Sequence, residues 1–278
     1  MSFDNHEYGT FSDRSMTVDL QLAGRVALVT AASRGLGRAT AETLGGEGMK
    51  VAVASRDLAA LKDVAETIDG GGGESLPLAL DLSRSESIEE VVNRVLERWG
   101  RIDVLVANAP GPPAGPFESI SRQQWRDAID MNVLSILDLT RAVLPTMKKQ
   151  GGGRIIYITT IGVRTVQPNM VLSNATRLAI SGVAKTLATE LAQDNILINS
   201  VAPGPIATGR MEEVIEEAME RLGVSRDEAE KVWLSDVPMG RMGLPGDLAS
   251  VVALLSSPRC SYTTGSVIPV DGGKDRGY

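Results

Sequence analysis

The chain has 278 residues, of which 43% are hydrophobic, so it holds enough apolar material to bury one sizeable core. Its net charge of −7 excludes the basic face that nucleic-acid binding requires. No apolar run approaches the roughly 20 residues of a membrane span, and the polar N-terminus lacks the apolar core of a signal peptide. We therefore expect a cytoplasmic protein with no nucleic-acid or membrane partner, a flexible tail at residues 1–20 and one domain over residues 21–278.

Histidine and cysteine are almost absent. His6 is the only histidine and lies in the tail, and Cys260 is the only cysteine. A Ser-His-Asp triad, a histidine general base and most zinc sites are thereby excluded, so no metal site is expected. A lone cysteine forms no internal disulfide and most often serves packing.

Short β-branched runs alternate with longer helical stretches along the chain. Strands are predicted at Val26–Thr30, Val51–Ala54, Leu76–Leu80, Val104–Ala107, Ile155–Thr159, Ile196–Val201 and Val267–Val270. Helices are predicted near residues 36–47, 57–68, 86–99, 121–149, 174–193 and 246–256. The strands lack clean alternation, which is typical of strands buried on both faces of a parallel sheet. The order predicts right-handed βαβ units in one α/β sheet.

Residues 205–240 interrupt this rhythm, because they are far longer than an ordinary connection between a strand and a helix. Glutamates recur there at helical spacing from Glu212 to Glu220, which by itself indicates a solvated helix face. Long insertions at the carboxyl end of a sheet often close over ligands, so we expect a lid-like segment at about 205–240.

The first predicted strand runs directly into the turn Thr30-Ala31-Ala32-Ser33-Arg34-Gly35-Leu36-Gly37, and a helix follows. Glycines in such a turn let the backbone approach a pyrophosphate, whose charge then lies on the free N–H groups of the helix N-terminus. A strand before the turn and a helix after it indicate a dinucleotide-binding site.

Two arginines near this turn bear on the identity of the cofactor. Arg34 lies within it, and Ser55 and Arg56 follow the second strand. An acidic residue there would hydrogen-bond the ribose of NAD, whereas an arginine accommodates the 2′-phosphate of NADP. Asp57 is better placed to cap the next helix, so NADP(H) is favoured over NAD(H).

Further motifs follow in order, and together with the turn they resemble the classical short-chain dehydrogenase/reductase family over about residues 22–273. They are Asp81-Leu82, Ala107-Asn108-Ala109, Asn132, Pro203-Gly204, Thr208 and Val270-Asp271-Gly272-Gly273. The resemblance, which extends to 3-oxoacyl-carrier-protein reductases, implies a doubly wound Rossmann sheet of about seven strands with helices on both faces, and usually a homotetramer. It implies a cofactor site at Thr30, Ser33, Arg34, Gly35, Leu36, Gly37, Ser55, Arg56, Asp81, Leu82, Asn108, Ala109, Arg177, Pro203, Gly204, Ile206 and Thr208.

The catalytic group of that family is a tetrad of Asn, Ser, Tyr and Lys, and this chain departs from it. Asn132 matches, while Thr160 stands at the Ser position, Ser173 at the Tyr position and Arg177 at the Lys position. A serine hydroxyl is a far weaker acid than a phenol, and Arg offers a planar fork in place of a compact ammonium. Loss of a matched proton donor typically costs about 10²–10⁴-fold in rate.

Two functions remain open on this basis. One is an NADP(H)-dependent oxidoreductase that transfers hydride between nicotinamide and a small carbonyl or alcohol substrate, with a water held by the altered tetrad in place of the phenol. The other is a non-catalytic dinucleotide-binding regulator or an inert subunit. Pro110–Pro116, the lid-like segment and Trp233 are expected to border the substrate pocket, and Arg164 is a candidate partner for a substrate anion.

Overall fold

Seven parallel strands form one sheet in the order β3-β2-β1-β4-β5-β6-β7. The structure, a computed structural model, describes residues 18–277. The strands are β1 (Val26–Thr30), β2 (Lys50–Ser55), β3 (Glu74–Ala79), β4 (Val104–Ala107), β5 (Gly153–Ile158), β6 (Ile196–Pro203) and β7 (Val267–Val270). This arrangement confirms the predicted doubly wound α/β sheet, and every predicted strand is present within two residues at each end.

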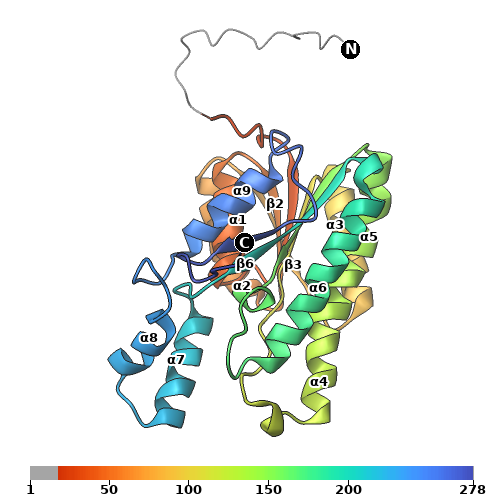
Figure 1. The fold of residues 1–278 in the computed structure, drawn as a ribbon. Helices are drawn as coiled ribbons and strands as arrows, with labels where there is room; N and C mark the ends of the chain where they lie inside the picture. The colour runs from red at the N-terminus through yellow and green to blue at the C-terminus, as the bar shows by residue number, and fades with distance from the viewer. Residues whose placement is uncertain (1–17, 278) are drawn as a thin grey trace, which may run out of the picture.

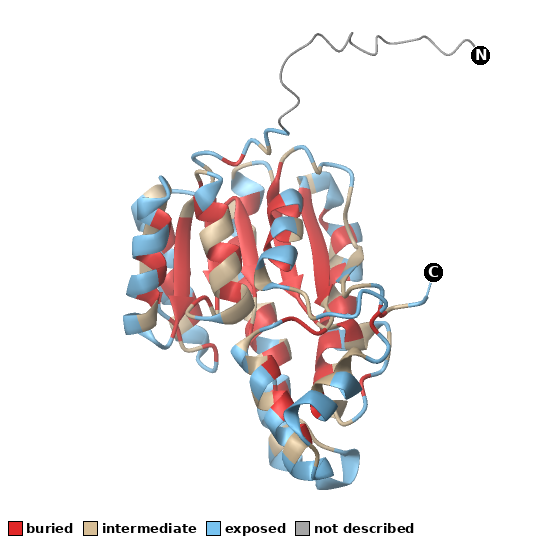
Figure 2. Cartoon of the chain, turned by 90° about the vertical axis from the view of Figure 1, so that its left-hand side faces the viewer, coloured by how far each residue is buried: buried red, intermediate tan, exposed pale blue. Residues whose placement is uncertain are grey.

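Helices cover both faces of the sheet (Figure 1). One layer consists of α1 (Gly35–Gly46), α2 (Leu58–Gly70) and α9 (Pro245–Ser256). The other consists of α3 (Ser85–Trp99), α5 (Ser135–Lys149) and α6 (Val171–Glu190), with α4 (Arg122–Ile129) beside α6. Each layer shares its own apolar cluster with one face of the sheet. The buried strands between the two layers are visible in Figure 2.

The two edge strands differ from the prediction that every strand is buried on both faces. Strands β3 and β7 are only partly buried, because each has a neighbour on one side alone. Each also contains a proline, Pro77 or Pro269. Proline has no backbone N–H to donate, and an edge strand tolerates it because one side of that strand has no partner strand.

The long helix predicted over residues 121–149 is interrupted by a π-helical turn. Helix α4 ends at Ile129, residues Asp130–Leu134 form the π turn, and α5 begins at Ser135. Periodicity alone does not reveal one inserted residue in a helix, and such π turns occur frequently at functional sites.

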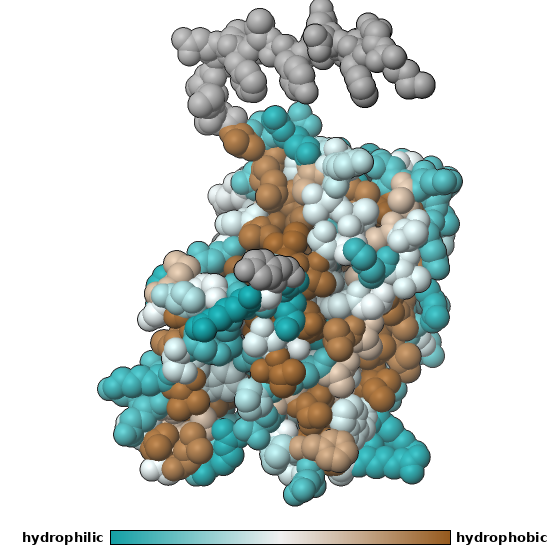
Figure 3. Space-filling view, in the orientation of Figure 1, coloured by the Kyte–Doolittle hydropathy of each residue, from teal (hydrophilic) through white to brown (hydrophobic). Residues whose placement is uncertain are grey.

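The lid-like segment folds into two helices, α7 (Gly209–Leu222) and α8 (Arg226–Leu234), which share a small apolar core of their own. The two ends of the segment are held together, because the Ala207 N–H donates to the Gly243 carbonyl and the Gly243 N–H donates to the Pro205 carbonyl. The helix pair projects from the carboxyl end of the sheet, beside the ends of α4 and α6 (Figure 1). Apolar surface is present both on the helix pair and on the neighbouring ends of α4 and α6 (Figure 3).

The predicted tail at residues 1–20 lies almost wholly outside the described residues. Packing against the body begins at Leu20, whose carbonyl accepts a hydrogen bond of 2.6 Å from Ser257. Within residues 18–277 no helix is both long and apolar enough to cross a bilayer.

Candidate active site

A cleft of about 600 Å³ opens at the carboxyl ends of the strands. Strands β1 and β4 are neighbours there, and the chain proceeds from them toward opposite edges of the sheet. Loops diverge at such a switch point, and they leave a crevice in which open α/β sheets bind their ligands. The cleft extends from the turn after β1 to the lid-like segment.

The turn after β1 is shaped for a phosphate group. Helix α1 starts at Gly35 with no side-chain cap and no acidic residue in its first turn, so its first N–H groups remain free for an anion. A Cβ atom at Gly37 would lie 2.2 Å from the carbonyl oxygen of Ala31, so only glycine allows this close approach of helix and turn. Ala31 itself has φ +48°, an unfavourable value for a residue with a side chain.

Positive charge lies where the adenosine ribose of a dinucleotide would reach. The Arg34 side chain is 79% exposed and Arg56 also lines the cleft. Arg56 forms no ion pair within the described residues, whereas Arg34 lies 3.8 Å from Glu213 of α7. Asp57 accepts a 3.0 Å hydrogen bond from the Ala60 N–H, which confirms it as the cap of α2. Asp57 therefore forms no ion pair with Arg34 or Arg56.

The wall opposite this turn is formed by Asp81, Leu82, Asn108 and Ala109. Hydrogen bonds from Ser83 hold the pKa of the Asp81 carboxyl below its usual range, so that group is ionised at neutral pH. Thr30 does not reach the cleft. Its buried hydroxyl donates to the Asn108 carbonyl at 2.6 Å and accepts from the Asn108 N–H at 2.9 Å, so it positions this wall from behind.

Ser173 and Arg177 lie one turn apart on α6 and both line the cleft. The Arg177 guanidinium donates to the carbonyl oxygens of Ile158 and Ala109, each at 2.8 Å, and thereby joins the ends of β5 and β4. Burial lowers the pKa of Arg177 to about 10, because no carboxylate of the described residues compensates for the lost hydration. The group therefore remains a cation at neutral pH, in the position that the resemblance assigns to lysine.

The remaining two tetrad positions are held by backbone contacts. Thr160 follows β5, and its hydroxyl accepts a hydrogen bond from the Gly162 N–H at 3.3 Å while it lines the cleft. Asn132 lies in the π turn, fully buried behind the cleft, and donates to the Pro110 carbonyl at 2.7 Å. Its Oδ1 atom accepts no hydrogen bond from residues 18–277.

All but three of the predicted site residues line this one cleft. The three exceptions, Thr30, Gly37 and Asn132, support its walls from within. Their assignment to cofactor binding and catalysis rested on the resemblance, which does not separate direct contact from support.

Sequence reasoning missed several lining residues, notably Arg210 and Glu213 on α7 and Gln167 in the loop after β5. Arg210 and Glu213 lie one helical turn apart beside Thr208, a spacing from which the pair could have been found. Gln167 had no such signal. Arg164, by contrast, pairs with Asp275 of the C-terminal segment, so its role as a partner for a substrate anion is not supported.

The fold and the cleft together define a dinucleotide-type α/β protein, and comparisons with known proteins agree. A family profile described as enoyl-(acyl carrier protein) reductase matches residues 30–275. The chain is 34% identical over 254 residues to the 3-oxoacyl-acyl-carrier-protein reductase of Thermotoga maritima, covering 91% of this chain and 99% of that one.

Solved structures give the same result. An L-sorbose reductase from Gluconobacter frateurii, complexed with NADPH and L-sorbose, is similar with a TM-score of 0.88 at 29% identity, covering 94% of this chain and 100% of that one. A variant of actinorhodin polyketide ketoreductase with NADPH has a TM-score of 0.88 at 32% identity, covering 91% and 98% of the two chains. The chain belongs to the short-chain dehydrogenase/reductase family.

Proposed function

We propose that this protein is an NADP(H)-dependent oxidoreductase that interconverts a small carbonyl compound and its alcohol. The observation that carries the proposal is the composition of the cleft at the carboxyl ends of the strands. One end offers the free N-terminus of α1 with Arg34 and Arg56, and the other end offers the hydroxyls of Ser173 and Thr160 beside the Arg177 cation. NADPH in the similar reductase structures supports the choice of cofactor.

Different residues of the cleft bind different parts of the cofactor in this reaction. The α1 N-terminus and Arg34 would hold the pyrophosphate and Arg56 the 2′-phosphate, while Arg177 supplies positive charge near the nicotinamide ribose. When bound, the nicotinamide supplies or accepts the hydride at the carbonyl carbon.

Proton transfer is the step in which this chain departs from its family. Ser173 is too short and too weak an acid to replace a phenol directly. We propose that a water molecule held by the Ser173 and Thr160 hydroxyls gives a proton to the substrate oxygen and regains one from solvent. The Arg177 charge stabilises the developing alkoxide. A weakly acidic water molecule is then a sufficient proton donor.

A second candidate function is a dinucleotide-binding protein without turnover. It is favoured by the two hydrogen bonds that engage Arg177 with the ends of β4 and β5, because they give this side chain a structural role that requires no substrate. This candidate shares the cofactor site with the first and differs only in the chemistry.

The test is oxidation of NADPH against a broad panel of carbonyl compounds, with wild type compared to the double variant Ser173→Tyr/Arg177→Lys. Turnover by wild type above that of the double variant is the expected result and indicates a proton route of its own. Turnover only in the double variant, with NADPH binding intact in both, would overturn the enzymatic proposal in favour of the binding protein.

A further inference from the structure

A second cavity, of about 250 Å³, lies at the amino end of the sheet, opposite the candidate active site. It is bordered by the start of β5, the glycine loop before it and the segments that precede β1 and β4. Its lining includes Arg25, Arg101, Asp103, Arg154 and Asn195. Nothing in the proposed reaction uses it.

The charge around this cavity is positive, although the whole chain carries a net charge of −7. Three arginines and one aspartate line it. The aspartate, Asp103, is already engaged: Arg101 binds it through two hydrogen bonds of 2.5 and 2.9 Å, Arg25 lies 3.5 Å away, and the Val26 N–H donates to it at 2.9 Å. An excess of two positive charges therefore remains in a concave site.

Arg154 is the arginine of this cavity whose positive charge no carboxylate of the described residues balances. It is 9% exposed, and Nη1 donates to the carbonyl oxygens of Gly153 at 3.0 Å and Asn195 at 3.5 Å. Its Nε–H is buried and donates to no group within residues 18–277, and no carboxylate there lies within ion-pair distance of it. Burial, followed by repulsion from Arg25, lowers the pKa of Arg154.

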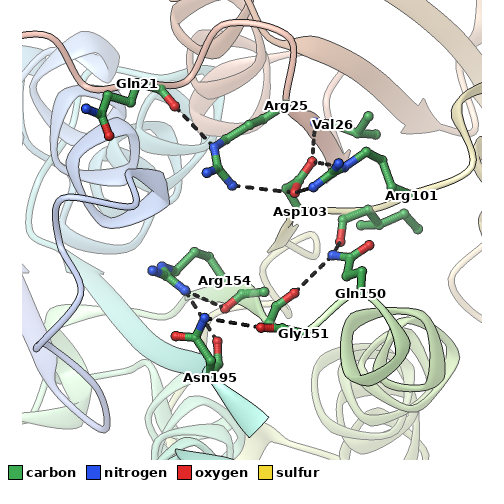
Figure 4. A network of polar contacts seen from close by, with 12 residues as sticks. Gln21, Arg25, Val26, Arg101, Asp103, Gln150, Gly151, Arg154 and Asn195 are labelled. Carbon is green, nitrogen blue, oxygen red and sulfur yellow. Dashed lines mark hydrogen bonds and ion pairs between the residues drawn. The ribbon is translucent and has the colours of Figure 1, made fainter.

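Figure 4 shows how these groups are arranged. The Arg25–Asp103–Arg101 cluster lies on one side, and Arg154 lies with Asn195 on the other. An unpaired buried guanidinium is costly, because its lost hydration is not replaced. An anion between the two sides would lie near the Arg154 guanidinium and offset the repulsion between Arg154 and Arg25.

We propose that this cavity is a binding site for a small oxyanion of the phosphate type, either free or as the phosphate of a small ester. Its volume accommodates one phosphate group with a short substituent but not a dinucleotide, for which the active-site cleft is more than twice as large. Guanidinium groups match the geometry of phosphate oxygens. The site is separate from the cofactor cleft, so both are expected to be filled at once.

The test is calorimetric titration of the full chain with inorganic phosphate at low ionic strength, in a buffer free of other oxyanions, with glycerol phosphate as a second probe. Because Arg34 and Arg56 in the active-site cleft also attract phosphate, the double variant Arg34→Ala/Arg56→Ala is the matched control and is expected to retain phosphate binding at this site. Arg154→Met is expected to weaken it at least tenfold. Tighter binding of the ester than of phosphate would identify the ester as the source of the anion.

The reverse pattern, in which binding is lost in the cleft variant and kept in Arg154→Met, would overturn the proposal, as would no binding to wild type. If Arg154→Met does not fold, Arg25→Gln gives a second measurement, because Arg25 is partly exposed and Arg101 still neutralises Asp103. That variant is expected to bind phosphate about fivefold more weakly, since it removes one charge from the rim.

Discussion

Arg177 lies at the position where the resemblance predicts a lysine, and it makes contacts that depend on its guanidinium. Its guanidinium spans from α6 to the ends of β4 and β5 through two hydrogen bonds, a reach that a single ammonium cannot reproduce in the same planar geometry. The cation is kept at the centre of the candidate active site. Two of its donors, however, are committed to the protein, so fewer remain for a ligand.

Cofactor choice is also decided at single residues. Arg56 has no ion-pair partner in the described chain and lines the cleft, so it is free to take a 2′-phosphate. We expect Arg56→Ala to weaken NADPH binding about 10–100-fold, with little effect on NADH, because only NADPH loses a charge-assisted contact. Fluorescence titration with both cofactors measures this change.

Arg38→Ala is the matched control for that measurement, because Arg38 lies on α1 outside the cleft and pairs with Glu42. Equal weakening of NADPH and NADH in Arg56→Ala would mean that the residue does not read the 2′-phosphate.

At the scale of elements, α7 is joined to both sides of the cleft. Arg210 donates to the Pro112 carbonyl at 3.0 Å and pairs with Glu213 at 3.0 Å, and Glu213 in turn lies 3.8 Å from Arg34. This chain of contacts runs from the loop after β4 to the turn after β1. It connects the lid-like segment to both sides of the cleft.

We expect Arg210→Ala to loosen this helix pair, because it removes the hydrogen bond to Pro112 that joins α7 to the body and the contact within α7 that orients Glu213 toward Arg34. Amide exchange over residues 209–234 is expected to speed up, and NADPH is expected to dissociate about 5–30-fold faster. Hydrogen-exchange mass spectrometry and stopped-flow displacement measure these two effects.

Arg226→Ala is the control within the same element. Among residues 18–277, Arg226 forms ion pairs with Glu212 and Glu230 alone, so it joins α7 to α8 and not to the body. The two variants should differ in NADPH dissociation. If Arg226→Ala releases NADPH as fast as Arg210→Ala does, general loosening of the helix pair explains the result and the contacts across the cleft do not.

At the scale of the whole molecule, stability at high pH depends on Tyr157 in the buried strand β5. Thr140 gives its own proton to the Ile136 carbonyl, so the Tyr157 hydroxyl donates to Thr140 at 2.8 Å. Burial raises the pKa of Tyr157 to about 12. In the unfolded chain a tyrosine ionises near pH 10. The raised pKa therefore gives stability that is complete below pH 10 and is lost as pH rises to 12.

We expect wild type to lose about 2–3 kcal/mol relative to Tyr157→Phe between pH 9 and 12. At neutral pH the variant should be about 1 kcal/mol less stable, because it lacks the hydrogen bond to Thr140, so the order of stability should reverse near pH 11. Denaturant unfolding at a series of pH values measures this difference. Tyr262→Phe, at a fully exposed position, is the control, and a constant gap between wild type and Tyr157→Phe would contradict the expectation.

The sequence by itself determined the sheet, its strands and the place of the cofactor turn. Buried parallel strands are nearly continuous apolar runs, and a glycine turn between strand and helix has a strict spacing, so both are visible locally. The resemblance then predicted a departure from the family tetrad at Thr160, Ser173 and Arg177, which stays a prediction.

Only the tertiary structure decided which of these residues face the ligand and which support them. Thr30 and Asn132 lie behind the cleft wall because of contacts to segments far away in sequence, with Asn108 and Pro110 respectively. The same holds for three further features that sequence analysis did not predict. They are the π turn, the pairing of Arg164 with Asp275 and the unpaired Arg154 at the opposite end of the sheet. Each depends on a distance across the fold, which spacing along the chain does not contain.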